Sequence, residues 1–308
     1  MTETLRIACL AIIYIAHIAI VPLLLIGIIR TAKARLQGRQ GPSPLQPFRD
    51  IAKLLRKGET VSTVAFWTFL GAPLVTLAAT VAAALMVPWL GIDSPIAGDL
   101  LLFIYLLTLA KVVISLSALD TASGFGAIGA SREAAVSLFS EPAMLAGLAA
   151  LAAHAGTTNL NAMLTPGTVT VETSVVAGLT AVGLWMAIMA DLNRMPIDDP
   201  TTHLELTMIH EAQILDNSGR NLAIVEYTVA LRLCLFVGLV GRVAMLALPP
   251  VTPVVAYLAS LALLCLGAGV IAVSEVGMVR LGWRRIPNLL SFSVAASLLA
   301  CLLVALKG

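Results

Sequence analysis

The sequence contains few charged residues and few aromatic ones. Asp, Glu, Lys and Arg make up 12% of its 308 residues, and Phe, Trp and Tyr make up 5%. Because a water-soluble domain carries roughly 25% charged residues, this composition excludes a soluble α/β enzyme and a disordered chain. The formal net charge of +2 is too small for the basic surface of a nucleic-acid-binding protein, so we expect no nucleic-acid partner.

Cysteine is also scarce, and no Cys-x-x-Cys pair occurs. Cys9, Cys234, Cys265 and Cys301 all lie within apolar runs. Zinc sites, iron–sulfur clusters and disulfide frameworks need clustered thiols. We therefore predict that these cysteines fill the core as small hydrophobic side chains and that the chain holds no metal of its own.

Long apolar runs are abundant, with 59% hydrophobic residues and a mean hydropathy of +0.97. Spanning a hydrocarbon core of about 30 Å takes about 20 helical residues. Eight runs meet this length: Leu5–Ile29, Val64–Leu90, Leu100–Ala118, Glu133–Ala155, Thr173–Ala190, Ala223–Leu248, Val254–Met278 and Asn288–Leu306. We predict an all-α polytopic membrane protein whose residues 1–308 form a single membrane domain, with amphipathic helices in the loops at about 30–63, 119–132, 191–222 and 279–287.

Basic residues gather in alternate loops. Fourteen of them lie in loops of one parity: Arg30, Lys33, Arg35, Arg39, Arg49, Lys53, Arg56, Lys57, Arg132, Arg194, Arg220, Arg280, Arg284 and Arg285. The chain ends contribute only Arg6 and Lys307, and the opposite loops contain none. Because Lys and Arg are retained in cytoplasmic loops, we predict that these four loops face the cytoplasm and that both termini lie outside.

The first cytoplasmic loop contains a predicted amphipathic helix that starts near Pro47. Its apolar stripe is Phe48, Ile51, Ala52 and Leu55, and its cations are Arg49, Lys53, Arg56 and Lys57. The helix could lie at the membrane interface with its cations near anionic headgroups, or it could dock a partner protein. The pattern leaves both open.

The loop after the fifth span holds six of the seventeen acids and two of the four histidines. Asp199 and Pro200 are typical of a helix start, and an apolar stripe at helical spacing follows: Leu204, Met208, Ala212 and Leu215. His203 and His210 fall on one face of this predicted helix. The HExxH spacing of a zinc site is absent, so we expect hydrogen bonds from these histidines and no metal.

Several spans carry charges, although a charge at the helix centre costs about 2.5–3.5 kcal/mol on insertion scales. Lys111, Glu141, Arg232 and Arg242 lie inside spans, and Glu226 and Glu275 lie nearer the inner ends of theirs. Snorkelling to the interface suits Arg242 and Glu275. It does not suit Glu141, whose side chain is short and about 12 Å from the inner end of its predicted helix.

We interpret Glu141 as part of a hydrated proton or ion path, and static ion pairing is the alternative. For Lys111 and Arg232, a place in that path and a purely structural pairing are equally open. The segment GFGAIGAS lacks the lysine of a phosphate-binding loop, so its glycines predict a tight turn between two spans.

Three motifs resemble a known family. GRQGPSPLQPFRDIAKLL, GAIGASREAAVSLFSEP and ADLNRMPIDDP resemble conserved segments of membrane subunit 1 of respiratory complex I and of its relatives in membrane-bound nickel–iron hydrogenases. The resemblance places Glu141 on the family's intramembrane glutamate and Asp191 on a second glutamate position. Glu205 and Glu226 fall on further acidic positions.

Departures from the complex I pattern favour the hydrogenase and formate hydrogenlyase branch. Thr201 and His203 replace two glutamates after the Asp-x-Pro turn, and the first loop is several residues shorter. LDTASGFGAIGASREA, DDPTTHLELTMIHE and RIPNLL look more like the hydrogenase branch. These differences argue against a conventional quinone site but keep the acidic path nearly complete.

The resemblance implies a non-catalytic core subunit of an energy-converting complex in the prokaryotic cytoplasmic (inner) membrane. It would dock a hydrophilic redox arm and couple electron transfer to proton or sodium translocation. The implied partners are hydrogenase-type large and small subunits, an iron–sulfur protein on the cytoplasmic side, antiporter-like membrane subunits and the lipid bilayer. The nickel–iron centre and the iron–sulfur clusters are expected in those partners.

The candidate residues form two sets. The proton or ion path comprises Lys111, Glu141, Asp191, Glu205, Glu226 and Arg232. The second set is assigned to docking of the redox arm or to a quinone-like cavity, and it comprises Arg39, Gln46, Arg49, Asp50, Lys53, Arg132, Arg194, Asp198, Asp199, His203, His210 and Glu211.

Three alternatives remain. The chain could be the quinone-site subunit of a complex I-like NADH dehydrogenase, or an inert anchor whose charges are structural. It could also be a stand-alone secondary transporter, although the internal repeat typical of such proteins is absent from the sequence.

Overall fold

The computed structural model describes residues 3–167, 169–198 and 208–306. Its helices are α1 (Glu3–Leu36), α2 (Gln46–Leu55), α3 (Trp67–Met86), α4 (Leu100–Asp120), α5 (Gly124–Ala155), α6 (Leu160–Met163), α7 (Val171–Asp191), α8 (His210–Ile214), α9 (Gly219–Met245), α10 (Pro253–Gly277), the 3₁₀ turn η1 (Trp283–Arg285) and α11 (Ile286–Ala305). In these ranges there is no β-strand, only one isolated bridge between Asp99 and Asn159. Eight of the described helices (α1, α3, α4, α5, α7, α9, α10 and α11) are long and apolar enough to cross a membrane. The prediction of an all-α polytopic membrane protein is confirmed.

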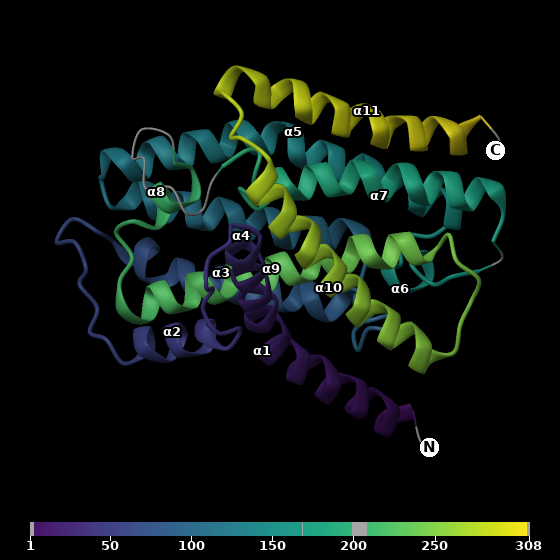
Figure 1. The fold of residues 1–308 in the computed structure, drawn as a ribbon, viewed down its shortest axis with the longest axis horizontal. Coiled ribbons are helices and arrows are strands. Elements are labelled where there is room, and N and C mark those ends of the chain that lie inside the picture. Colours follow the sequence, from purple (N-terminus) through teal and green to yellow (C-terminus); the bar gives the residue numbers. More distant parts are fainter. Residues whose placement is uncertain (1–2, 168, 199–207, 307–308) are drawn as a thin grey trace.

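Three sets of helices pack around α9. Helices α5, α7 and α11 pack side by side, α3 packs against α4, and α1 and α10 cross the bundle obliquely (Figure 1). Both chain ends lie at the end of the bundle opposite α2 and α8 (Figure 1). This agrees with an even number of spans, and the cytoplasmic side remains a prediction from the basic residues.

Helix α9 is buried on nearly all sides. Leu231, Leu233, Leu235, Phe236 and Leu239 each have a relative exposure of 0%. A helix that is apolar all round belongs in the interior of a bundle. Arg232 therefore reaches the centre of the protein, midway between the ends of α9.

Helix α2 forms where the sequence predicts it, and two residues of its predicted stripe, Phe48 and Ile51, pack against the core. Pro47 is buried and Ile51 and Leu54 are partly buried, whereas Ala52 and Leu55 are exposed. The preceding chain explains this orientation, because Pro44 lies so close to Gly27 of α1 that a Cβ at Gly27 would be 1.9 Å from its carbonyl oxygen. The predicted stripe is therefore wrong for Ala52 and Leu55.

The predicted turn at GFGAIGAS is also wrong, since its glycines begin α5 at Gly124. Gly129 allows α8 to approach the helix closely, because a Cβ there would lie 2.9 Å from the backbone nitrogen of Gln213 and the carbonyl oxygen of Ile209. Close helix packing, and not chain reversal, requires glycine at this position. Helix α5 consequently starts nine residues before the predicted span at Glu133.

The helix predicted from Asp199 begins outside the described residues. Its described part is helical only over His210–Ile214, so Met208 precedes the helix.

The prediction that the cysteines fill the core is correct for Cys234, which is buried, but wrong for Cys9 and Cys265, which are exposed. The outer faces of spanning helices are as apolar as the core, so an apolar run does not distinguish the two locations.

Candidate functional site

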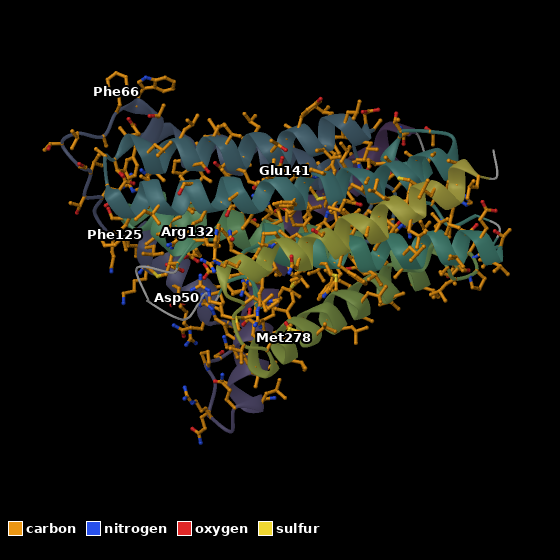
Figure 2. All side chains as sticks on the ribbon, turned by 90° about the horizontal axis from the view of Figure 1, so that it is seen from above. Asp50, Phe66, Phe125, Arg132, Glu141 and Met278 are labelled. Atoms are coloured by element: carbon orange, nitrogen blue, oxygen red, sulfur yellow. The ribbon has the colours of Figure 1, made fainter. Side chains whose placement is uncertain are left out.

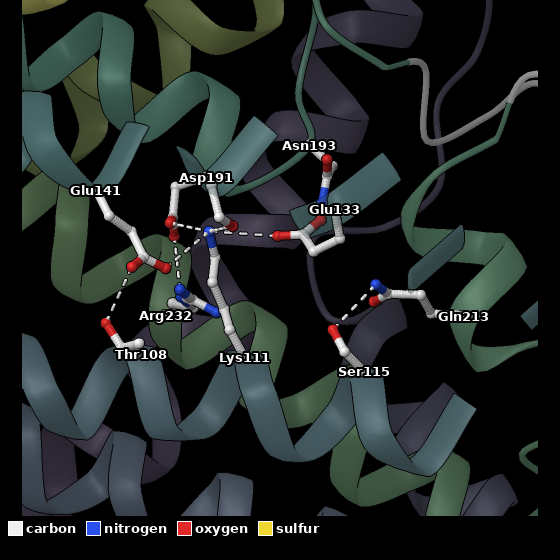
Figure 3. A network of polar contacts seen from close by, with 10 residues as sticks. Thr108, Lys111, Ser115, Glu133, Glu141, Asp191, Asn193, Gln213 and Arg232 are labelled. Atoms are coloured by element: carbon white, nitrogen blue, oxygen red, sulfur yellow. Dashed lines mark hydrogen bonds and ion pairs between the residues drawn. The ribbon is translucent and has the colours of Figure 1, made fainter. Parts of the chain in front are cut away.

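Lys111 lies near the middle of α4 and contacts three carboxylates from two other helices. Its Nζ is 2.5 Å from Asp191 Oδ1, 3.3 Å from Glu133 Oε1 and 3.9 Å from Glu141 Oε1. Arg232 adds a second cation, with Nη2 2.7 Å from Asp191 Oδ2. We call these five side chains the Lys111 cluster, and Figure 3 shows how they converge from α4, α5, α7 and α9.

The cluster is largely removed from solvent. The side chains of Lys111, Glu133 and Asp191 are 5%, 6% and 2% exposed, whereas that of Glu141 is 25% exposed. Three carboxylates against two cations give a formal charge of −1 when all five groups are ionised. Binding one proton makes the cluster neutral, so its electrostatic energy depends strongly on how many protons it holds.

Neutral polar groups extend the cluster toward both sides. Asn193 follows α7 in the left-handed region (φ 49°), which asparagine tolerates well, and its amide donates to Glu133 Oε2 at 2.5 Å. The hydroxyl of Ser137 accepts from Lys111 at 2.7 Å, and that of Thr108 donates to Glu141 Oε2 at 3.3 Å. In Figure 3, Asn193 and Thr108 flank the two carboxylates at opposite sides of Lys111.

Two cavities lie beside the cluster. The smaller, of about 50 Å³, is lined in part by Lys111, Glu133, Asp191 and Arg232. A cavity of that size, bordered by these charged side chains, has room for ordered water, which needs about 10–15 Å³. The larger cavity, of about 340 Å³, lies between α1, α2 and α9 and shares four lining residues with the smaller one: Leu192, Asn193, His210 and Val229.

A second ion-pair group lines the larger cavity. The Glu275 carboxylate is 3.2 Å from Lys33 Nζ and 2.9 Å from Arg194 Nη1, and its side chain is 2% exposed. These contacts join α1, α10 and the segment after α7. Snorkelling is therefore wrong for Glu275, and it is also wrong for Arg242, which is buried. Both side chains turn inward because the bundle surrounds them.

The predicted path residues do not all come together. Glu141, Asp191, Lys111 and Arg232 belong to the Lys111 cluster, whereas Glu226 lines the larger cavity. Among the residues that the structure describes, Glu226 has no ion pair or hydrogen bond through its carboxylate. Glu205 lies outside the described residues.

The residues assigned to docking or to a quinone-like cavity form two groups. Gln46, Asp50, Arg132, Arg194, Asp198, His210 and Glu211 are at least partly buried. Asp50, Arg194, Asp198, His210 and Glu211 line the larger cavity, and Gln46 donates to Asp50 at 2.9 Å. The guanidinium of Arg132 donates to the carbonyl of Met208 at 2.9 Å. Arg39, Arg49 and Lys53 are exposed at the same end of the protein. Asp199 and His203 lie outside the described residues.

Two ion pairs join separate segments of the chain at the end of the protein that contains α2 and α8. Asp50 on α2 is 3.3 Å from Arg30 on α1, and their side chains are 44% and 48% exposed. Asp198 is 3.1 Å from Arg280 and also accepts the backbone N–H of Ile209 at 2.9 Å. The second pair is more enclosed, since the Asp198 side chain is 4% exposed. It ties the segment after α7 to the α10–α11 connection.

Two functional candidates escaped the sequence analysis, Glu133 and Asn193, and a third, Glu275, was expected to snorkel and not to form ion pairs. Glu133 was taken as the first residue of its span because the preceding glycines were assigned to a turn. Extending the helix back to Gly124 would have placed Glu133 inside the span, two turns before Glu141 on the same helix. Nothing in the sequence indicates that Glu275 pairs with Lys33, more than two hundred residues away.

Comparison with known proteins identifies the family. The family model described as NADH dehydrogenase matches residues 9–305. Formate hydrogenlyase subunit 4 of Escherichia coli (strain K12) is 35% identical over 228 residues, which cover 72% of this chain and 73% of that protein. Hydrogenase-4 component C of the same organism is 30% identical over 215 residues, covering 69% and 67%.

The fold is also found in a solved structure. A chain of the archaeal membrane-bound sulfane sulfur reductase, a respiratory membrane complex, superposes with a TM-score of 0.78 at 20% identity, covering 97% of this chain and 99% of that one. This similarity concerns the fold alone. From the family model and the two curated relatives, the chain belongs to the NADH dehydrogenase family of membrane subunits, that of complex I subunit 1, and resembles its hydrogenase and formate hydrogenlyase members.

Proposed function

We propose that the chain is a non-catalytic membrane core subunit of an energy-converting complex of the hydrogenase or formate hydrogenlyase type. It would dock a hydrophilic redox arm and couple electron transfer to the movement of protons or sodium ions. The observation that carries this proposal is the Lys111 cluster, in which one buried lysine bridges three carboxylates within membrane-spanning helices. Ionisable groups at such depth mark proton or ion paths.

The arrangement of the cluster suits a relay from the inner end of the bundle. The larger cavity opens among α1, α2 and the segment after α7, and it adjoins the smaller cavity at Asn193 and His210. Glu133 receives a hydrogen bond from Asn193, and Lys111 links Glu133 to Glu141. A change in charge near Asn193 would therefore reach Glu141 through contacts of at most 3.9 Å.

The outer half of the bundle supports this interpretation over a stand-alone transporter. From Leu233 to Leu239, α9 is buried and apolar apart from its backbone. A substrate passing straight through this chain would need a polar route there, and the two cavities beside the Lys111 cluster lie on the inner side of this segment. An inert anchor is disfavoured by the unbalanced charge of the cluster and its adjoining space for water.

The remaining parts of the proposal concern the environment of the chain. The complex would reside in the prokaryotic cytoplasmic membrane, with α2, α8 and the basic loops on the cytoplasmic side and both termini outside. Hydrogenase-type large and small subunits and an iron–sulfur protein would dock there, and these partners would carry the nickel–iron centre and the iron–sulfur clusters. Antiporter-like membrane subunits would lie beside the chain.

One observation favours a quinone-binding subunit as the second candidate. The larger cavity, of about 340 Å³, falls within the range of 300–1,000 Å³ that is typical of small-molecule sites. Its lining includes five acidic and three basic side chains besides apolar ones: Asp50, Asp198, Glu211, Glu226 and Glu275, and Arg30, Lys33 and Arg194. Photolabelling of α1 or α9 by a quinone analogue would support this candidate.

The experiment that tests the main proposal replaces Glu141 with Gln in the intact complex. Glutamine keeps the size of the side chain and can still accept the hydrogen bond from Thr108, but it cannot exchange a proton. We expect normal assembly and normal hydrogenase activity with artificial electron carriers, with coupled ion movement reduced at least tenfold. Glu59→Gln, at an exposed position between α2 and α3, should change neither activity. Full ion movement in the Glu141→Gln complex would refute the proposal.

A further inference from the structure

An open hollow lies beside the α10–α11 connection, away from the Lys111 cluster. Its volume is about 560 Å³, and its lining is Ser131, Arg132, Arg280, Leu281, Gly282, Trp283 and Ile286. Figure 2 shows side-chain nitrogens gathered at this end of the protein, around the labelled Arg132 and Met278. The hollow therefore combines an aromatic wall with guanidinium groups.

Positive charge exceeds negative charge among the described residues of this region. Arg284 and Arg285 follow Trp283 directly, are exposed, and form no ion pair with a described residue. Arg280 is already paired with Asp198, and Arg132 donates to the carbonyl of Met208. Arg284 and Arg285 do not line the hollow themselves, but they are exposed cations that lie in the chain between Trp283 and Ile286, which do.

The hollow lies at the start of a helix that is long and apolar enough to cross a membrane, Trp283–Ala305. The turn η1 runs directly into α11, whose first buried residue is Ile286. Trp283 is 46% exposed, and the apolar side chains of Met278 and Val279 are 52% and 85% exposed. Exposed tryptophan beside arginine at the end of a spanning helix is typical of the lipid headgroup layer, where water-facing apolar side chains can insert between acyl chains.

We propose that this hollow binds the headgroup of an anionic phospholipid. Arg284 and Arg285 would contact the phosphate, and Trp283, Met278 and Val279 would lie against the upper part of the acyl chains. Basic hollows between spanning helices on the basic side of a membrane protein are suited to anionic headgroups. The exposed apolar residues favour a lipid over an acidic protein surface, because they continue the contact from the phosphate into a hydrocarbon environment.

Two arginines near anionic headgroups strengthen lipid binding by about thirtyfold. A neutral double variant, Arg284→Gln with Arg285→Gln, should lose most of the preference for anionic over neutral lipid. Trp283 is unchanged in this variant, so its fluorescence reports the loss. The matched control is Arg56→Gln with Lys57→Gln, another pair of adjacent exposed cations in a different loop of the predicted cytoplasmic side. The proposal is independent of ion coupling, so its test does not depend on the proposed function.

The experiment uses the full chain in nanodiscs that contain phosphatidylcholine or phosphatidylglycerol brominated near the headgroup end of one acyl chain. Bromine quenches tryptophan fluorescence at contact distance, and subtracting the signal of a Trp283→Phe variant isolates Trp283 from Trp67, Trp89 and Trp185. We expect Trp283 to be quenched half-maximally at a much lower mole fraction of brominated phosphatidylglycerol than of brominated phosphatidylcholine. The Arg284/Arg285 variant should raise that fraction roughly ten- to thirtyfold, and the control should leave it unchanged.

Three results would overturn the proposal. Equal quenching of wild-type Trp283 by the two lipids would show an interfacial tryptophan without a headgroup site. An unchanged lipid preference in the Arg284/Arg285 variant would remove the arginines from the interaction. Absence of quenching by either lipid would place this surface outside the bilayer and favour a protein partner. The first comparison uses the wild-type chain, so it decides the question even if a variant folds poorly.

Discussion

Replacing Lys111 with methionine should destabilise the membrane domain by removing the cation that three carboxylates share. Methionine has a similar length and no charge, so the change leaves the packing of α4 largely intact. Asp191 would keep Arg232 as a partner, and Glu133 would keep only the amide of Asn193. The formal charge of the remaining cluster would change from −1 to −2.

The size of the effect follows from the distances and the burial. At an effective dielectric constant of about 20, attractions over 2.5, 3.3 and 3.9 Å amount to about 7, 5 and 4 kcal/mol before desolvation is subtracted. Desolvating Lys111 and its partners offsets most of this sum. Removing one partner from a buried ion pair costs about 3–5 kcal/mol, and we expect a loss of that size in the free energy of unfolding.

A double-mutant cycle measures the interaction directly. The free energy of unfolding is determined in detergent micelles for wild type, Lys111→Met, Glu133→Gln and the double variant. Because Glu133→Gln removes a carboxylate that Lys111 no longer neutralises, the double variant should be more stable than the sum of the single effects, by about 2 kcal/mol. Lys53→Met, an exposed cation on α2, should change stability by less than about 0.5 kcal/mol.

Additive effects of Lys111→Met and Glu133→Gln on the free energy of unfolding would refute the reasoning. If the double variant matched the sum of the single variants within about 0.5 kcal/mol, Lys111 and Glu133 would not interact in the folded protein. A loss for Lys111→Met no greater than that for Lys53→Met would show that the cluster is hydrated and does not contribute to stability.

Two further predictions concern the scaffold around the site. Gly129→Ala should lower the thermal unfolding temperature, because its Cβ would lie 2.9 Å from the Ile209 carbonyl oxygen and overpacking costs about 1–3 kcal/mol. Gly124→Ala, which meets open space, should be neutral or slightly stabilising, and equal effects of the two changes would contradict the packing argument. Asp120→Ala should lower the thermal unfolding temperature, since the carboxylate accepts the backbone N–H of Phe66 and Phe69 at the start of α3. Thermal unfolding no different from that of wild type would exclude this capping role.

The local chemistry of the sequence determined the spans and the depth of several charges. A spanning helix satisfies its own backbone and needs about 20 apolar residues, so both requirements can be read within one segment. Glu141, Lys111 and Arg232 were conspicuous because each interrupts such a segment at a place where charge is costly. The amphipathic helix α2 was also predictable, since its first-turn proline and helical spacing are local features.

Only the packing of the helices decided which charges meet. Lys111, Glu133 and Asp191 come from three helices, and Glu275 pairs with residues of α1 and of the segment after α7. Such contacts depend on how far each helix is rotated and shifted along its axis, which one segment alone does not specify. The same packing placed Glu226 at the larger cavity and turned Gly129 into a contact point for α8. The sequence therefore named the charged residues, and the tertiary structure decided their partners, because pairing requires distances of a few ångströms between segments far apart in the chain.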